Sequence, residues 1–113
     1  MQGIKKEKAD LLQGTLELLV LRLLGSGRLN GWDIMQRLHI ISGEILSATP
    51  GALYPALHRL EERGLVSASW GTSDNNRRSH FYRLTAAGKR QLEAERKYWE
   101  RFSGAVETIL REA

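Results

Sequence analysis

The fold is decided by residues 47–66, which read Ser-Ala-Thr-Pro-Gly-Ala-Leu-Tyr-Pro-Ala-Leu-His-Arg-Leu-Glu-Glu-Arg-Gly-Leu-Val. Thr49 and Pro50 predict a helix start, because a threonine hydroxyl accepts a free backbone N–H and proline is well tolerated at the first helical position. Apolar residues then recur at spacings of four and three, at Leu53, Leu57 and Leu60. This spacing predicts one buried side of a helix that Gly64 ends.

The opposite side of this helix is predicted to be free to receive a ligand. At about 100° per residue, Gly51, Pro55, His58 and Glu62 fall opposite the leucines, and Tyr54 and Arg59 flank them. Pro55 lies beyond the first turn of a helix that begins at Pro50. We therefore expect a separate turn or a distorted helical start there.

Two helices are predicted before this segment. Residues 11–24 carry leucines and a valine on almost every side of a helix, so we expect part of its surface to be reserved for a partner subunit. The glycines of residues 25–27 end this helix. Asn30 then caps a second helix that runs through Leu38, and Asp33 is favourably placed in its first turn.

Two strand-like runs, residues 65–70 and 79–84, flank a polar loop of turn residues. They predict a β-hairpin with Arg77 and Arg78 near its tip. A helix-turn-helix followed by such a hairpin is typical of a winged helix, whose second helix enters the DNA major groove. The expected fold is thus mainly α with a small antiparallel β-hairpin, a winged helix-turn-helix plus a C-terminal helix.

The C-terminal helix begins at Thr85, a third predicted cap. Its apolar residues from Trp99 onward follow at spacings of three, four and three, through Phe102 and Val106 to Ile109. No later segment of this sequence can cover the seam, so the pattern favours packing between two chains. We expect residues 1–88 to form the winged helix-turn-helix domain and residues 89–113 a dimerisation helix.

Composition agrees with a small DNA-binding protein. The 113 residues carry 17 Lys and Arg against 13 Asp and Glu, a formal net charge of +4, which suits an anionic partner. Cysteine is absent, so nothing points to an oxidising compartment, and we expect a cytoplasmic protein. The longest apolar run, residues 16–24, is shorter than the roughly 20 residues that a membrane span needs. We therefore expect no membrane association.

Four segments resemble the phenolic acid decarboxylase regulator (PadR) family. They are Leu-Gln-Gly-Thr-Leu at residues 12–16, Asn-Gly-Trp-Asp-Ile at 30–34, Gly-Ala-Leu-Tyr-Pro-Ala-Leu-His-Arg-Leu at 51–60 and Tyr-Arg-Leu-Thr-Ala-Ala-Gly at 82–88. The third and fourth segments, at their fixed separation, are highly specific. The resemblance implies a homodimeric repressor of the small subfamily, which has one C-terminal dimerisation helix. Asn30 and Trp32 stand where the family often has His and Tyr, and Ala52 stands where it often has Ser or Thr, which puts one polar DNA contact of the family in doubt.

The resemblance also implies site residues, carried over by position. Those expected to face DNA are Thr49, Gly51, Tyr54, Pro55 and His58. Those expected near phosphates are Thr15, Arg59, Arg77, Arg78 and Ser79. Those expected at a dimer interface, or around a small hydrophobic or aromatic effector, are Leu16, Leu19, Leu92, Tyr98, Trp99, Phe102, Val106 and Ile109.

We therefore expect a transcriptional regulator that binds double-stranded DNA, a repressor acting as a homodimer on a palindromic operator and released by an effector. The alternative is a winged-helix module that binds protein without binding DNA. Tyr54 is alternatively a packed aromatic residue, and Arg77 and Arg78 an ordinary solvated loop tip. The aromatic residues of the last helix are alternatively interface core with no ligand.

Enzymatic chemistry has little support. The sequence has no nucleophile elbow, no phosphate-cradling glycine loop and no isolated carboxylate pair, so we expect no catalytic residues and no cofactor. The three histidines fall in different elements without paired ligand spacing or thiols, so we expect no metal site.

Overall fold

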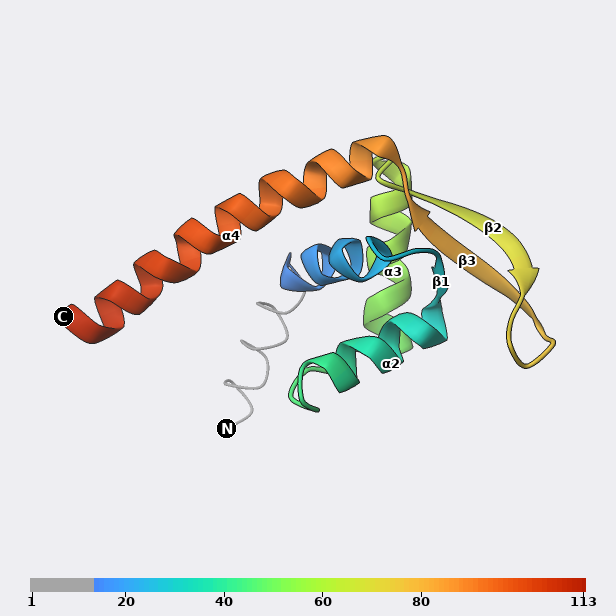
Figure 1. Cartoon of the computed structure of the whole chain (residues 1–113), viewed down its shortest axis with the longest axis horizontal. Coiled ribbons are helices and arrows are strands. Elements are labelled where there is room, and N and C mark those ends of the chain that lie inside the picture. Colours follow the sequence, from blue (N-terminus) through green and yellow to red (C-terminus); the bar gives the residue numbers. More distant parts are fainter. Residues whose placement is uncertain (1–13) are drawn as a thin grey trace.

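The computed structural model describes residues 14–113. A helix over residues 14–24 comes first, and the later elements are β1 (Leu29–Asn30), α2 (Gly31–Ile41), α3 (Pro50–Glu62), β2 (Val66–Thr72), β3 (Arg78–Leu84) and α4 (Ala86–Glu112) (Figure 1). The predicted start of the first helix at residue 11, and the first two residues of the resemblance at 12–16, lie outside the described residues. Among the described elements, the order of helices followed by a hairpin and a long last helix agrees with the predicted fold class.

The predicted helix caps are confirmed. The side chain of Asn30 accepts a hydrogen bond from the backbone N–H of Asp33 at 2.8 Å, and that of Thr49 accepts from Ala52 at 3.2 Å. Each cap satisfies a backbone donor that has no partner inside its helix. These local hydrogen bonds explain why α2 and α3 begin where the sequence predicts.

The prediction of a separate turn before Pro55 is wrong, because α3 is one helix from Pro50 to Glu62 with Pro55 inside it. Pro55 cannot donate to the carbonyl of Gly51, four residues earlier. Both residues are exposed, so water can reach the carbonyl that proline leaves without a partner. The helix therefore tolerates this proline on its solvent side.

The sheet has three strands in the order β1-β3-β2, all antiparallel, whereas the sequence predicts only the β2–β3 hairpin. The extra strand is short: Leu29 pairs with Tyr82 and Asn30 with Phe81. Asn30 thus ends a strand and caps α2 at once. This pairing fixes the start of α2 to the middle of β3.

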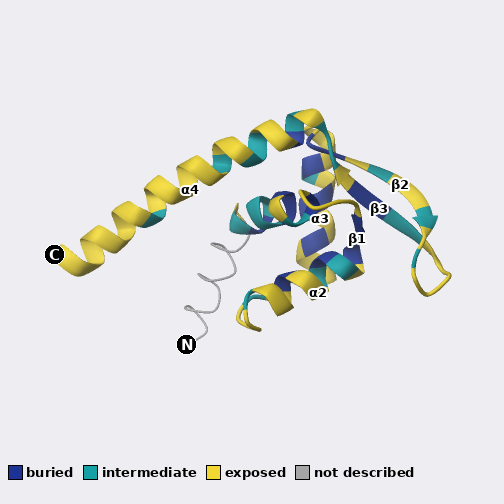
Figure 2. Cartoon of the chain, viewed as in Figure 1, coloured by how far each residue is buried: buried dark blue, intermediate teal, exposed yellow. Residues whose placement is uncertain are grey.

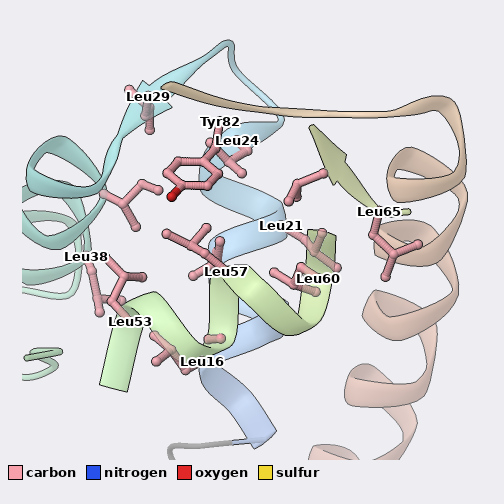
Figure 3. Close-up of a cluster of buried hydrophobic side chains, with 14 residues drawn as sticks. Leu16, Leu21, Leu24, Leu29, Leu38, Leu53, Leu57, Leu60, Leu65 and Tyr82 are labelled. Carbon is pink, nitrogen blue, oxygen red and sulfur yellow. The ribbon is translucent and has the colours of Figure 1, made fainter. Parts of the chain in front are cut away.

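The core lies between the first helix, α3 and the sheet (Figure 3). Leu53, Leu57 and Leu60 of α3 are fully buried, as predicted, in the same core cluster as Leu21 of the first helix. Each such leucine contributes about 1.5–3 kcal/mol by leaving water. The core therefore holds α3 by one side and leaves its other side in solvent.

The start of α4 is attached to the end of α3. The hydroxyl of Thr85 donates to the carbonyl of Gly64 at 2.6 Å, and the backbone N–H of Thr85 donates to the carbonyl of Leu65 at 3.1 Å. Gly88 is buried against Leu65 with no room for a side chain. Beyond this attachment α4 extends away from the other elements, and most of it is exposed (Figure 2).

Candidate nucleic-acid interface

The outward face of α3 is the first candidate surface. Gly51, Pro55 and His58 are exposed, while Leu53 and Leu57 on the other side are buried. A side chain at Gly51 would meet only the Thr49 hydroxyl oxygen, at 3.7 Å, so this turn leaves open space above its backbone. A bulky partner can therefore approach the helix closely at Gly51.

Tyr54 of α3 is 39% exposed and points toward the start of α2. Its phenol end covers Gly31, where any side chain would overlap the ring. Burial raises the pKa of the neighbouring Tyr82, with smaller contributions from the charges of Tyr54 and Glu61. Tyr54 thus combines a packing role with a partly exposed ring, which keeps both sequence interpretations open.

Arg59 is not a free cation. Its Nε donates to the carboxylate of Glu17 on the first helix at 3.3 Å. The Glu17 side chain is 20% exposed, so the pair lies at the edge of the core. An arginine held by a carboxylate offers less charge to a phosphate than an unpaired one does.

The turn between β2 and β3, residues 73–77, is called the wing tip here, and a backbone hydrogen bond closes it. The N–H of Ser73 donates to the carbonyl of Arg77 at 2.7 Å, and Asn76 adopts the left-handed conformation with φ of 59°. Asparagine tolerates that conformation better than most residues do. Arg77 and Arg78 are both exposed at this tip, and Ser79 is half-buried.

A groove of about 470 Å³ separates the wing tip from the start of α2. Trp32, which is 64% exposed, lines it from α2 together with Asp33. Arg77, Arg78 and Ser79 line it from the hairpin. The groove brings three predicted phosphate contacts together beside an exposed indole.

Sequence reasoning missed two aromatic residues of the hairpin. Trp70 is 59% exposed, and its ring stacks on that of His80 at 4.6 Å between centroids. The guanidinium of Arg78 lies 4.9 Å from the centre of the Trp70 ring. Strict alternation along residues 66–72 and 78–84 could have placed these side chains on one face, but only the strand register brings them together.

The second candidate surface is the exposed side of α4. Four of its predicted apolar residues are exposed: Trp99 to 45%, Phe102 to 49%, Val106 to 39% and Ile109 to 63%. Leu110, which is not among the predicted interface residues, is 77% exposed. Isolated exposed apolar side chains are ordinary, but a continuous helical row is typical of an interaction surface. Most of this part of α4 is exposed (Figure 2).

The other predicted interface residues lie closer to the core. Leu16 is 4% exposed and belongs to the core cluster, while Leu19 and Leu92 are partly buried against it. Thr15 lies far from the wing tip residues in the lining of a different hollow, of about 500 Å³, between the first helix and α4. That hollow is lined mainly by apolar and aromatic groups, among them Leu18, Tyr98, Trp99 and Phe102.

The residues described by the structure, 14–113, contain no group of three or more His, Asp or Glu side chains arranged to hold a metal ion. Within the same range, each helix is either too short or too polar to cross a bilayer.

Residues 20–94 match the family model described as the transcriptional regulator PadR-like family. The chain belongs to this family. The match includes α2, α3 and the whole hairpin, the elements that present the first candidate surface. The family consists of transcriptional regulators, which confirms the prediction of a regulator and not an enzyme.

Relatives of this PadR-like chain are found at moderate identity. The negative transcriptional regulator PadR of Bacillus subtilis is 30% identical over 77 residues, which span 68% of this chain and 42% of that protein. The transcriptional regulator Rv3488 of Mycobacterium tuberculosis is 40% identical over 58 residues, 51% of this chain and 53% of that one. The crystal structure of a PadR family regulator from Eggerthella lenta aligns with a TM-score of 0.81 at 25% identity, covering 99% of this chain and 96% of that one. The three-stranded winged-helix fold with a long last helix is thus a PadR-like fold.

Proposed function

We propose that this PadR-like protein binds double-stranded DNA in a sequence-specific manner through the outward face of α3. One observation carries the proposal: the core holds α3 by its leucine side and leaves Gly51, Pro55 and His58 exposed. A helix presented in this way fits the major groove, where base edges are distinguishable. His58 would donate to a base acceptor or a phosphate, and Gly51 would allow close backbone approach. Thr49 and Ser79 would add hydroxyls for phosphates, and Tyr54 would face the DNA with the exposed part of its ring.

We propose that the protein acts as a homodimer joined through α4. The exposed row from Tyr98 to Ile109 has the spacing of a coiled-coil seam and offers apolar area that a second copy would remove from water. Leu19 and Leu92 are only partly buried and keep some apolar surface for a partner, whereas Leu16 is buried in the chain's own core. A two-fold dimer then presents two α3 helices to half-sites about 34 Å apart, which predicts a palindromic operator.

We propose repression as the outcome, acting in the cytoplasm. The support for repression is the printed name of the Bacillus subtilis relative, a negative regulator. A dimer bound to an operator would block other proteins from the same promoter DNA. Repression by such competition requires DNA binding alone.

A small hydrophobic or aromatic molecule is the proposed effector. The hollow between the first helix and α4, about 500 Å³, falls within the size range of ligand pockets and offers the rings of Tyr98, Trp99 and Phe102. Thr15 and Glu95 supply polar groups at its edge. An occupant there would touch both helices that the proposed dimer uses.

The test of DNA binding is fluorescence anisotropy against a pool of duplexes from the upstream region of the gene, at two salt concentrations. Sequence-selective binding that falls steeply with salt supports the proposal, because phosphate contacts release counterions. The double variant Arg77→Ala/Arg78→Ala is expected to weaken binding at every sequence and to reduce the salt dependence. Binding no tighter than to a random duplex contradicts it.

A protein-binding winged helix is the second candidate function. Ile40, Ile41 and Ile45 are 66%, 71% and 82% exposed around the end of α2, an apolar cluster that DNA contact does not require. If no duplex binds, co-purification through this cluster, lost in Ile41→Glu and insensitive to salt, supports the second function.

The effector proposal is tested with the aromatic dye anilinonaphthalene sulfonate. The dye is expected to quench tryptophan fluorescence and to weaken DNA binding at the same concentration. Trp99→Ala is expected to lose most of the quenching, while Trp32 and Trp70 supply the remaining signal. Quenching that is unchanged in Trp99→Ala contradicts a site in this hollow.

A further inference from the structure

The hairpin carries a row of rings on one face. Trp70 pairs with His80 across the two strands, and Ala68 pairs with Tyr82. Paired side chains of antiparallel strands lie on the same face, as do alternate residues of one strand. Tyr82 is part of the core, so this face begins under the helices and continues uncovered toward the wing tip.

The contacts along this row are continuous. The ring of His80 lies 5.3 Å from that of Tyr82, and the ring of Trp70 stacks on His80 with 22° between the planes. The guanidinium carbon of Arg78 lies 4.9 Å from the centre of the Trp70 ring. Arg78 therefore packs on a row of rings whose last member, Tyr82, belongs to the core.

Arg78 has no carboxylate partner among the residues that the structure describes. Asp33 and Asp74 line the same groove, yet neither forms an ion pair with it. A planar guanidinium held against a ring loses less freedom when it binds an anion than a side chain that is free in solvent. The hairpin thus presents one cation that is both oriented and unpaired.

We propose that Trp70 is a positioning residue that holds Arg78 for insertion into a DNA minor groove, so that the wing distinguishes A·T-rich from G·C-rich DNA. The inference rests on the proposed DNA-binding function. A·T-rich tracts have a narrow minor groove with enhanced negative potential, which attracts an inserted arginine. Arg77 lies in the turn before β3 and is not part of the row of rings. It would contribute positive charge without a preference for A·T-rich DNA.

The test compares two operator-free duplexes of equal length, one of repeated AATT blocks and one of alternating G·C pairs, at one low salt concentration. The wild-type chain is expected to bind the AATT duplex about tenfold more tightly, measured by fluorescence anisotropy. Trp70→Ala and Arg78→Lys are each expected to bring this ratio to within about twofold of one, because lysine keeps the charge but does not stack as a planar group.

The double variant Trp70→Ala/Arg78→Lys separates positioning from direct contact. If Trp70 acts through Arg78, the double variant has the same ratio as either single variant. A double variant that binds the AATT duplex more weakly than either single variant would show that Trp70 contributes independently, which contradicts the positioning role. Arg111→Lys, the same substitution at the far end of α4, is the matched control and is expected to keep the wild-type ratio.

Other outcomes are equally decisive. A wild-type ratio near one, or an unchanged ratio in Trp70→Ala, overturns the inference and leaves DNA binding intact. Absence of binding to both duplexes and to the upstream pool contradicts the proposed function itself. Thermal unfolding of each variant detects loss of the hairpin. Should Trp70→Ala unfold, the ratio is measured in Arg78→Lys and in Trp70→Leu instead. Trp70→Leu keeps an apolar side chain but removes the ring, so it is expected to bring the ratio to within about twofold of one.

Discussion

The hydroxyl of Thr85 donates a hydrogen bond to the carbonyl of Gly64, while its oxygen accepts one from the backbone N–H of Gly88 at 3.0 Å. One side chain thus caps α4 and satisfies a carbonyl just beyond the end of α3. Gly64 has a φ of 72°, in the left-handed region that glycine adopts without strain. The helix proposed to contact DNA and the helix proposed to join two copies therefore meet at one residue.

Thr85→Val is expected to lower the free energy of unfolding by about 2 kcal/mol, because the cap and the hydrogen bond to Gly64 are lost together. Urea titration followed by far-ultraviolet circular dichroism measures the change. Thr85→Ser keeps the hydroxyl and is expected to stay within about 0.5 kcal/mol of the wild type. A loss in Thr85→Ser with none in Thr85→Val would show that the methyl group, and not the hydrogen bonds, stabilises this site.

Gly88→Ala is expected to lower the free energy of unfolding by about 2 kcal/mol, because the new side chain would overlap the carbonyl of Leu65. Gly104→Ala on the same helix meets nothing within 4 Å and is expected to raise it by roughly 1 kcal/mol through helix propensity. Urea titrations at one protein concentration compare the two. The same sign for both substitutions would contradict the close packing of Gly88 on Leu65.

The stability of the protein is expected to fall as the pH rises above about 10, the ordinary pKa of tyrosine. Burial raises the pKa of Tyr82, so above this pH the unfolded chain loses a proton that the folded chain keeps, and unfolding becomes easier. Unfolding midpoints between neutral and strongly alkaline pH measure the decline. Tyr82→Phe, although less stable overall, is expected to show a shallower decline, and Tyr98→Phe at an exposed position is expected to match the wild type.

Phe102→Glu is expected to weaken dimerisation at least about tenfold, because a carboxylate would be buried in the apolar row of α4. Sedimentation velocity over a range of protein concentrations measures the association. Thr108→Glu places the same charge on the opposite side of α4, away from the row, and is expected to leave the association unchanged. A dimer that survives Phe102→Glu would place the contact between copies elsewhere.

Local features of this fold could be predicted from the sequence. The caps at Asn30, Thr49 and Thr85 each depend on a hydrogen bond that spans three residues, so the sequence pattern contains all the information that the cap needs. The buried leucines of α3 likewise follow from helical periodicity alone.

Features that join distant segments could not be predicted. Arg59 and Glu17 lie 42 residues apart, and nothing in either helix indicates that the arginine of the outward face is already paired. The two-residue strand β1 is too short for any alternation to show. Trp70 belongs to a row of rings only because the register sets it opposite His80, and a shift of one residue would turn it to the other face.

The attachment at Thr85 has a mechanical consequence for the molecule. The 27 residues of α4 extend about 40 Å at 1.5 Å per residue, measured from a pivot that also holds the end of α3. A rotation of only about 5° at this pivot moves the far end of the helix by roughly 3.5 Å, which is comparable to the gap that a flat aromatic ring needs between two surfaces. A molecule the size of such a ring, inserted against the far part of α4, would therefore change the angle between α4 and α3 by a few degrees.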